Sequence, residues 1–248
     1  MWAKVTIPLV SVAVGGFLSV APASVLEPTG DSDCRDLLQK VTQLASVVRE
    51  NTGQALAETF RSLHDKCLNA NIDVRIAAKA AVVVSQYGSE WSDEEDLELL
   101  TWIDSRLRYE EPCEERSAVL RAIGVTLGAL GRFEKAENSL LEALELRKQV
   151  RGPMSAEVVE DLQVLSFLHA QWARQSEPEK HRQRALEYAE EAISETKARV
   201  GPRGPEMERM RLHLVGLLEE LGIAGEAAEK VLRKYDWETE ESSATKPE

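Results

Sequence analysis

The strongest constraint on the fold is a pattern that occurs twice in the second half of the chain. Residues 136–153 (AENSLLEALELRKQVRGP) and 185–202 (ALEYAEEAISETKARVGP) align at a constant offset of 49 residues. The matching positions are Ala136 and Ala185, Ala143 and Ala192, Gly152 and Gly201, and Pro153 and Pro202. Repeats of this length build solenoids, in which each unit buries its apolar face only against its neighbours. Such a chain is expected to hold partners, and to do no chemistry.

The composition agrees with a helical protein. Glycine and proline are few, 14 and 9 among 248 residues, and most of them lie between segments whose apolar residues recur at helical spacing. Long helices are therefore expected, and strands are not.

The net charge bears on the class of partner. The chain carries 43 acidic and 30 basic side chains, a formal net charge of −13. An acidic surface repels the phosphate backbone, so nucleic acid is not an expected partner. Acidity also aids solubility, and this alone can account for it.

The sequence divides into five parts. Ser92 followed by Glu95 forms a capping box at the start of one helix in the part 33–113. The predicted parts are an export signal or membrane anchor at 1–23, a linker at 24–32, a helical region of degenerate repeats or helical hairpins at 33–113, a repeat domain at 114–236, and an acidic disordered tail at 237–248.

The first part has the features of a targeting segment. Val5 to Val20 contains no charged residue, and Ala21-Pro22-Ala23 forms an A-x-A pattern that predicts cleavage after Ala23. As a helix this run covers about 24 Å, less than a hydrocarbon core of about 30 Å. A cleaved export signal is favoured, with a retained anchor as the alternative. The expected location is the periplasm, the secretory lumen or a membrane; the alternative is the mitochondrial inner membrane or intermembrane space.

Three cysteines allow one disulfide. Cys34 begins the first predicted helix and Cys67 lies near the end of the second, so an antiparallel hairpin brings them side by side. A Cys34–Cys67 disulfide is the candidate in an oxidising compartment, and in a reducing one the two would be buried thiols. Cys113 remains as the candidate free thiol.

The segment LRAIGVTLGALGRFEKAENSLLEALEL combines small residues with larger apolar ones. The small ones are Gly124, Gly131, Ala136 and Ala143, and the larger ones are Leu120, Ile123, Leu127, Phe133 and Leu140. This unit resembles a tetratricopeptide repeat (TPR). The resemblance implies an all-α fold, a right-handed superhelical solenoid of antiparallel helix hairpins. It also implies that Gly124, Ala136 and Ala143 lie where the two helices cross, and that Gly131 lies in the turn.

Two further units follow. Ser166, Ala185 and Ala192 take the small sites of the second, whose turn carries about seven extra residues around QSEPEKHRQ. Without this insertion the repeat length is 42 residues, which resembles the kinesin-light-chain-like TPR subgroup. In the third unit Val215, Gly222 and Ala227 match, and Lys234 replaces the later small residue, as a final solvent-facing helix requires.

The resemblance also implies a binding site. In TPR arrays the first helices line a concave groove, and the inward-facing positions here are Arg121, Val125, Glu160, Gln163, Phe167, Arg209 and Leu212. Gln163 keeps an amide of the subgroup's Leu-Asn-Asn-Leu-Ala stretch, and Val164 does not. Two arginines beside a phenylalanine suit an acidic peptide, or a helix with one apolar anchor. The alternative is that Phe167 and Leu212 belong to the core and the arginines to a solvated face.

Catalytic motifs are absent from the sequence. There is no Gly-rich phosphate loop, nucleophile elbow, HExxH or CxxC. His64 and Cys67 have the spacing of half a metal site, but no second half is visible. No enzyme activity, metal, cofactor or small-molecule substrate is expected. The predicted function is a scaffold or adaptor that binds a protein or peptide partner outside the cytosol or at a membrane. The alternative is a structural or assembly subunit of a membrane complex, for example a mitochondrial one, anchored by residues 1–23.

Overall fold

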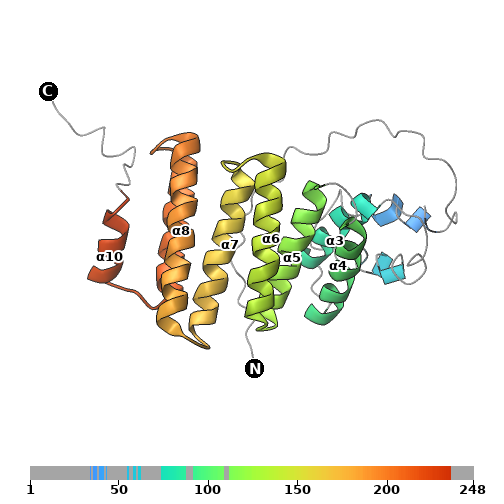
Figure 1. The fold of residues 1–248 in the computed structure, drawn as a ribbon, viewed down its shortest axis with the longest axis horizontal. Coiled ribbons are helices and arrows are strands. Elements are labelled where there is room, and N and C mark those ends of the chain that lie inside the picture. Colours follow the sequence, from blue (N-terminus) through green and yellow to red (C-terminus); the bar gives the residue numbers. More distant parts are fainter. Residues whose placement is uncertain are drawn as a thin grey trace.

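The computed structural model describes residues 74–87, 92–108 and 112–235, together with single helical residues between 34 and 62. Within these ranges the chain is helical and contains no strand. The helices are α3 (Val74–Tyr87), α4 (Asp93–Leu107), α5 (Glu114–Ala129), α6 (Phe133–Arg151), α7 (Ala156–Ala173), α8 (Pro178–Val200), α9 (Pro205–Glu220) and α10 (Glu226–Arg233). They follow one another in a row, from α3 and α4 at one end to α10 at the other (Figure 1).

The helix ends follow the local sequence. The Ser92–Glu95 capping box is confirmed: the Ser92 hydroxyl accepts from the backbone N–H of Glu95, whose carboxylate accepts from the backbone N–H of Ser92. Gly152 and Gly201 end α6 and α8 with φ of 87° and 85°, values that a residue with a Cβ rarely adopts. The repeated Gly-Pro pairs are therefore helix stops.

Two hairpins, α5–α6 and α7–α8, form the centre of the molecule. Gly124 lies where α5 crosses α6, and a Cβ there would come within 2.5 Å of Leu140 Cγ. Ala136 and Ala143 of α6 are fully buried, as are Ala185 and Ala192 of α8. The small residues expected at the helix crossings lie there, so this part of the fold prediction is confirmed.

The expected insertion in the second turn is wrong. The residues around QSEPEKHRQ do not form a long loop, because α8 begins at Pro178 and is 23 residues long, against 19 for α6. Pro178 is well placed there, since the first turn of a helix needs no backbone donor from that residue. Most of the extra residues therefore lengthen the two helices, chiefly α8, and the turn between them gains only one residue.

The third unit departs from the expected pattern at Ala227. This residue is exposed, whereas its counterpart Ala136 is fully buried. A second left-handed glycine, Gly225 with φ of 60°, delays the start of α10. No residue of α10 is fully buried, and only a few of its apolar side chains pack partly against the core.

Several sequence predictions concern residues outside the described ranges. These include the segment 1–23, the linker, the tail, His64 and Cys67, so the targeting segment and the Cys34–Cys67 disulfide stay predictions. Cys113 is a free thiol, as expected, but it is buried at the start of α5. Within the described residues, no helix is both long and apolar enough to span a bilayer.

Candidate functional site

The face that carries the candidate residues is built from the first helix of each hairpin. α7 contacts α5 on one side and α9 on the other, so the three first helices lie side by side. We call the exposed surface of α5, α7 and α9 the first-helix face. All seven predicted groove residues lie on these three helices.

Arg121 is engaged by acidic side chains of α7. Its Nη1 lies 3.4 Å from Glu160 Oε2, and its Nε lies 3.4 Å from Asp161 Oδ1. Asp161 is fully buried, and its Oδ2 accepts a 2.9 Å hydrogen bond from Arg147 Nε on α6. Burial raises the pKa of Asp161, and the two arginines oppose this by favouring the carboxylate. Arg121 and Glu160 are therefore parts of a network that joins the two central hairpins.

Three apolar residues on this face are at least partly accessible. Val125 on α5 is 42% exposed and Leu212 on α9 is 55% exposed. Phe167 lies between them on α7; it is half-buried, and its ring packs edge-on against His213 at a centroid distance of 4.9 Å. Val125 and Leu212 are not core residues, and Phe167 is only partly one.

Gln163 and Arg209 differ in their surroundings. The Gln163 amide donates a 3.5 Å hydrogen bond to the Met210 sulfur, across the α7–α9 contact. Arg209 is exposed, and among the described residues no carboxylate pairs with it. Only one of the two candidate arginines therefore keeps an uncompensated charge.

The contact between α7 and α9 also contains a polar pair. Ser166, at the predicted small site, donates 2.7 Å to the Gln163 carbonyl, and its hydroxyl lies 3.0 Å from His213 Nε2. Burial lowers the pKa of His213 to about 4, so the ring is neutral near neutral pH.

A second cluster, behind this face, was not expected from the sequence. His169 on α7 and His181 on α8 are buried, with their Nδ1 atoms 3.0 Å apart. Trp172 stacks on both rings, and the Trp172 and His181 centroids are only 3.9 Å apart. His169 Nε2 lies 3.2 Å from Glu137 Oε1 on α6. His181 comes from the extension of α8 that the sequence pattern had assigned to a turn.

This cluster is suited to packing. Burial lowers the pKa of both His169 and His181. Two Nδ1 atoms at hydrogen-bond distance need one protonated and one bare nitrogen, so neutral rings satisfy the contact. Within the described ranges, no three His, Cys, Asp or Glu side chains are arranged to hold a metal ion. The cluster fixes the start of α8 against α7.

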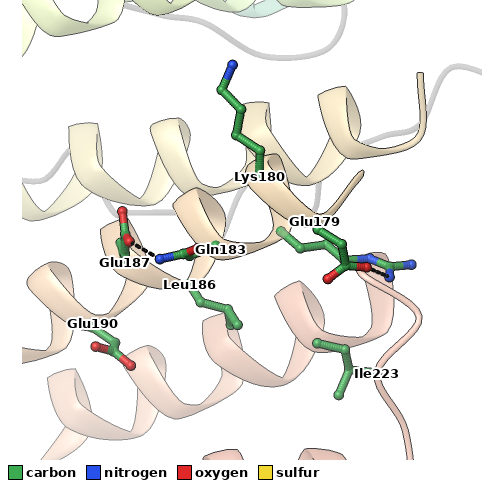
Figure 2. A pocket seen from close by; sticks show the side chains of 8 residues that line it. Glu179, Lys180, Gln183, Leu186, Glu187, Glu190 and Ile223 are labelled. Atoms are coloured by element: carbon green, nitrogen blue, oxygen red, sulfur yellow. Dashed lines mark hydrogen bonds and ion pairs between the residues drawn. The ribbon is translucent and has the colours of Figure 1, made fainter. Parts of the chain in front are cut away.

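An open cavity of about 670 Å³ lies beside α8 (Figure 2). Its lining residues are Glu179, Lys180, Arg182, Gln183, Leu186, Glu187, Glu190 and Ile223. Glu179 pairs with Arg182, and Gln183 donates to Glu187. Because these polar groups satisfy one another, the cavity offers no evident ligand site.

Comparisons with known proteins support the resemblance to TPRs. Residues 117–155 match the model of the tetratricopeptide repeat family. A comparison with curated protein sequences gave no match.

Solved structures share the fold. The crystal structure of BtubC (BKLC) from P. vanneervenii is 16% identical, with a TM-score of 0.55 over 87% of this chain and 92% of that one. A kinesin-light-chain-like protein of Podosopora anserina, with nearly identical TPR-like repeats, is 12% identical, with a TM-score of 0.60 over 86% and 97%. A single-residue variant of that protein is also 12% identical, with a TM-score of 0.61 over 83% and 94%. The predicted resemblance to kinesin-light-chain-like TPR proteins is confirmed.

Proposed function

We propose that this chain is a non-catalytic scaffold that binds a protein partner through its first-helix face. The observation that carries the proposal is the exposure of Val125 and Leu212 on helices that flank Phe167. Exposed apolar side chains that gather on one face, rimmed by polar ones, are typical of interaction sites. Helical repeat arrays use such continuous faces to bind extended or helical segments.

The charges on the face specify the partner further. Arg121 already faces Glu160 and Asp161, so it attracts an acidic ligand less than its position in the sequence indicated. A partner that enters with an apolar side chain near Val125 and Phe167 gains burial without disturbing this network. We therefore expect apolar anchors to dominate binding, with acidic residues contributing only near Arg209.

The place of action is the second part of the proposal. The uncharged run from Val5 to Val20 and the A-x-A pattern support a chain that acts outside the cytosol or at a membrane. The same run supports the alternative of a structural or assembly subunit of a membrane complex, held by residues 1–23. Intact-mass measurement of the native protein separates the two: a mature chain that begins at Ser24 contradicts the anchored subunit, and a retained Met1 contradicts the cleaved signal.

A single substitution tests the binding face. Val125→Glu keeps a good helix former on α5 and places a charge among the apolar side chains. We expect capture of the native partner to fall by about tenfold or more, as for loss of a buried apolar anchor. Capture is measured with purified variant chains on native extracts, followed by mass spectrometry.

The matched control is Met154→Glu. Met154 is 44% exposed, but it lies in the α6–α7 turn, away from the first-helix face. Unchanged capture by Val125→Glu, or an equal loss in both variants, contradicts the proposed face.

A further inference from the structure

One side of α9 faces away from the core along its length. Arg209, Leu212, Gly216 and Glu219 follow one another at intervals of three and four residues, the spacing that aligns side chains on one face of a helix. The buried residues of α9 lie on the opposite face: Met207, Met210, Leu214, Leu217 and Leu218. We call the first four residues the α9 stripe.

The charged residues of the stripe differ from the other charged residues of α9 in their ion pairing. The other charged side chains of α9 are paired: Glu206 with Arg199, Glu208 with Arg211, and Glu220 with Arg174. Arg209 and Glu219 are both exposed, and among the described residues neither has an ion-pair partner. The stripe therefore carries one positive and one negative charge, about 15 Å apart along the axis at 1.5 Å per residue.

Gly216 has no packing role among the residues that the structure describes. Glycine in the middle of a helix is destabilising relative to alanine, and it usually has a reason in packing or function. At Gly124 and Gly128 the reason is packing, because a Cβ would come within 2.5 Å of Leu140 and 2.9 Å of Leu168. At Gly216 a Cβ would meet no atom of the described residues within 4 Å. The missing side chain leaves a hollow on the helix surface that faces outward.

The stripe is complementary to itself. Arg209 and Glu219 lie five residues on either side of position 214, and Leu212 and Gly216 lie two residues on either side. If a second α9 packs antiparallel on the first about this position, Arg209 opposes Glu219 of the other copy, and this happens twice. Leu212, 55% exposed, then faces the hollow over Gly216 of the other copy. Opposite charges and large-to-small contacts are satisfied together, as an isologous two-fold interface requires.

We propose that the α9 stripe binds a second copy of this chain in a two-fold antiparallel contact. This inference rests on the proposed function, because it assigns a partner to the α9 part of the first-helix face. A single helix pair buries less than a standard interface of about 1,200–2,000 Å². Self-association is therefore weak and depends on concentration.

The proposal is tested by reversing single charges of the stripe in the full-length chain. Sedimentation velocity over a concentration series at low salt then measures the dimerisation of each variant. Arg209→Glu and Glu219→Arg each place like charges opposite one another twice, and each weakens dimerisation by about tenfold or more. The double variant restores both pairs and recovers dimerisation. An equimolar mixture of the two single variants also dimerises, because each copy then supplies the charge that the other needs.

Gly216→Ala provides an independent measurement. It fills the hollow and replaces a helix-breaking residue, so we expect a higher melting temperature together with weaker association. A misfolded variant cannot give this combination. Glu98→Arg, an exposed charge reversal on α4, is the control and leaves dimerisation unchanged.

Two outcomes overturn the inference: a wild-type chain that stays monomeric across the series, or a double variant that fails to recover. In either case Val125→Glu still reports on the proposed function, because Val125 lies on α5, outside the stripe. Failure of the two proposals is thus distinguishable.

Discussion

The central hairpins and the last hairpin follow the same repeat, but they pack differently. In α5–α6 a glycine lies at the crossing, and Ala136 of α6 is fully buried. In α9–α10 Val215 takes that glycine's place, and Ala227 is exposed. In α7–α8 the small Ser166 takes the same place, and Ala185 of α8 is still fully buried. The looser last hairpin therefore combines a larger residue at the crossing, Val215, with a second helix whose start is shifted by Gly225.

The two junctions between neighbouring hairpins also differ in the residues that fill them. Arg147 and Asp161 form a buried ion pair between the first and second hairpins. Their counterparts 49 residues later, Thr196 and Met210, are both buried between the second and third. Thr196 hydrogen-bonds its own helix at the Ala192 carbonyl, so no charge is buried there. Equivalent buried positions are thus occupied by an ion pair at the first junction and by largely apolar side chains at the second.

The largest expected effect comes from breaking the ionic junction. Arg147→Thr leaves Asp161 buried with only the more distant Arg121, which we expect to cost about 3 kcal/mol of unfolding free energy. The double variant Arg147→Thr/Asp161→Met copies the second junction and should recover most of that loss. Urea denaturation measures both. If the double variant is as unstable as the single one, the two junctions are not equivalent.

A smaller effect is expected at the crossing glycine. Gly124→Ala drives a Cβ into the buried Leu140 side chain, and overpacking of this kind costs about 1–3 kcal/mol. Gly216→Ala is the matched change in an open position, and it should stabilise the chain by about 0.5–1 kcal/mol. Thermal unfolding of both variants compares them. Equal shifts of the same sign would contradict the close approach of α5 and α6.

The smallest expected effect is a change of local stability with pH, of opposite sign in α4 and at the α7–α9 contact. Burial, with Asp93 and Glu95 nearby, raises the pKa of Asp96 in α4 to about 6, above an unfolded value near 3.9. Its contribution is lost as pH rises through 6 and is regained on acidification. His213 has its pKa lowered to about 4 from near 6.5, so its contribution is lost as pH falls through that window.

From pH 7 to pH 5 we therefore expect α4 to gain, and the α7–α9 contact to lose, about 1–2 kcal/mol each. Hydrogen exchange, corrected for the intrinsic rate, resolves the two regions. Asp96→Asn should remove the gain at α4, and His213→Gln the loss at α9. A response of the same sign in both regions would show that these two groups do not control it.

The parts of the fold that depend on local pattern were predictable. Capping at Ser92, the helix stops at Gly152 and Gly201, and the small sites at Ala136 and Ala143 each depend on residues a few positions apart. They can be read from the local sequence because a helix end or a helix crossing restricts the type of residue at one particular position.

Contacts across the array were not predictable in the same way. Arg121 was expected to face a ligand, but its partner Glu160 lies 39 residues along the chain. His181 was assigned to a turn, because an extension of a helix and a longer loop add the same number of residues. Ala227 matches the pattern, but Gly225 changes where α10 begins. For Arg121 and His181 the deciding contacts join residues on different helices, which no local spacing relates, whereas at Ala227 a second turn glycine two residues earlier overrides the repeat pattern.

The extension of α8 has a consequence for how the repeats relate to one another. Trp172 on α7 and His181 on α8 stack at a centroid distance of 3.9 Å, and Phe133 of the preceding hairpin stacks on Trp172 at 5.7 Å. The second hairpin is therefore matched to the one before it by side chains that a copy of α5–α6 does not carry. Although the chain is built from repeated units, the order of those units is not interchangeable.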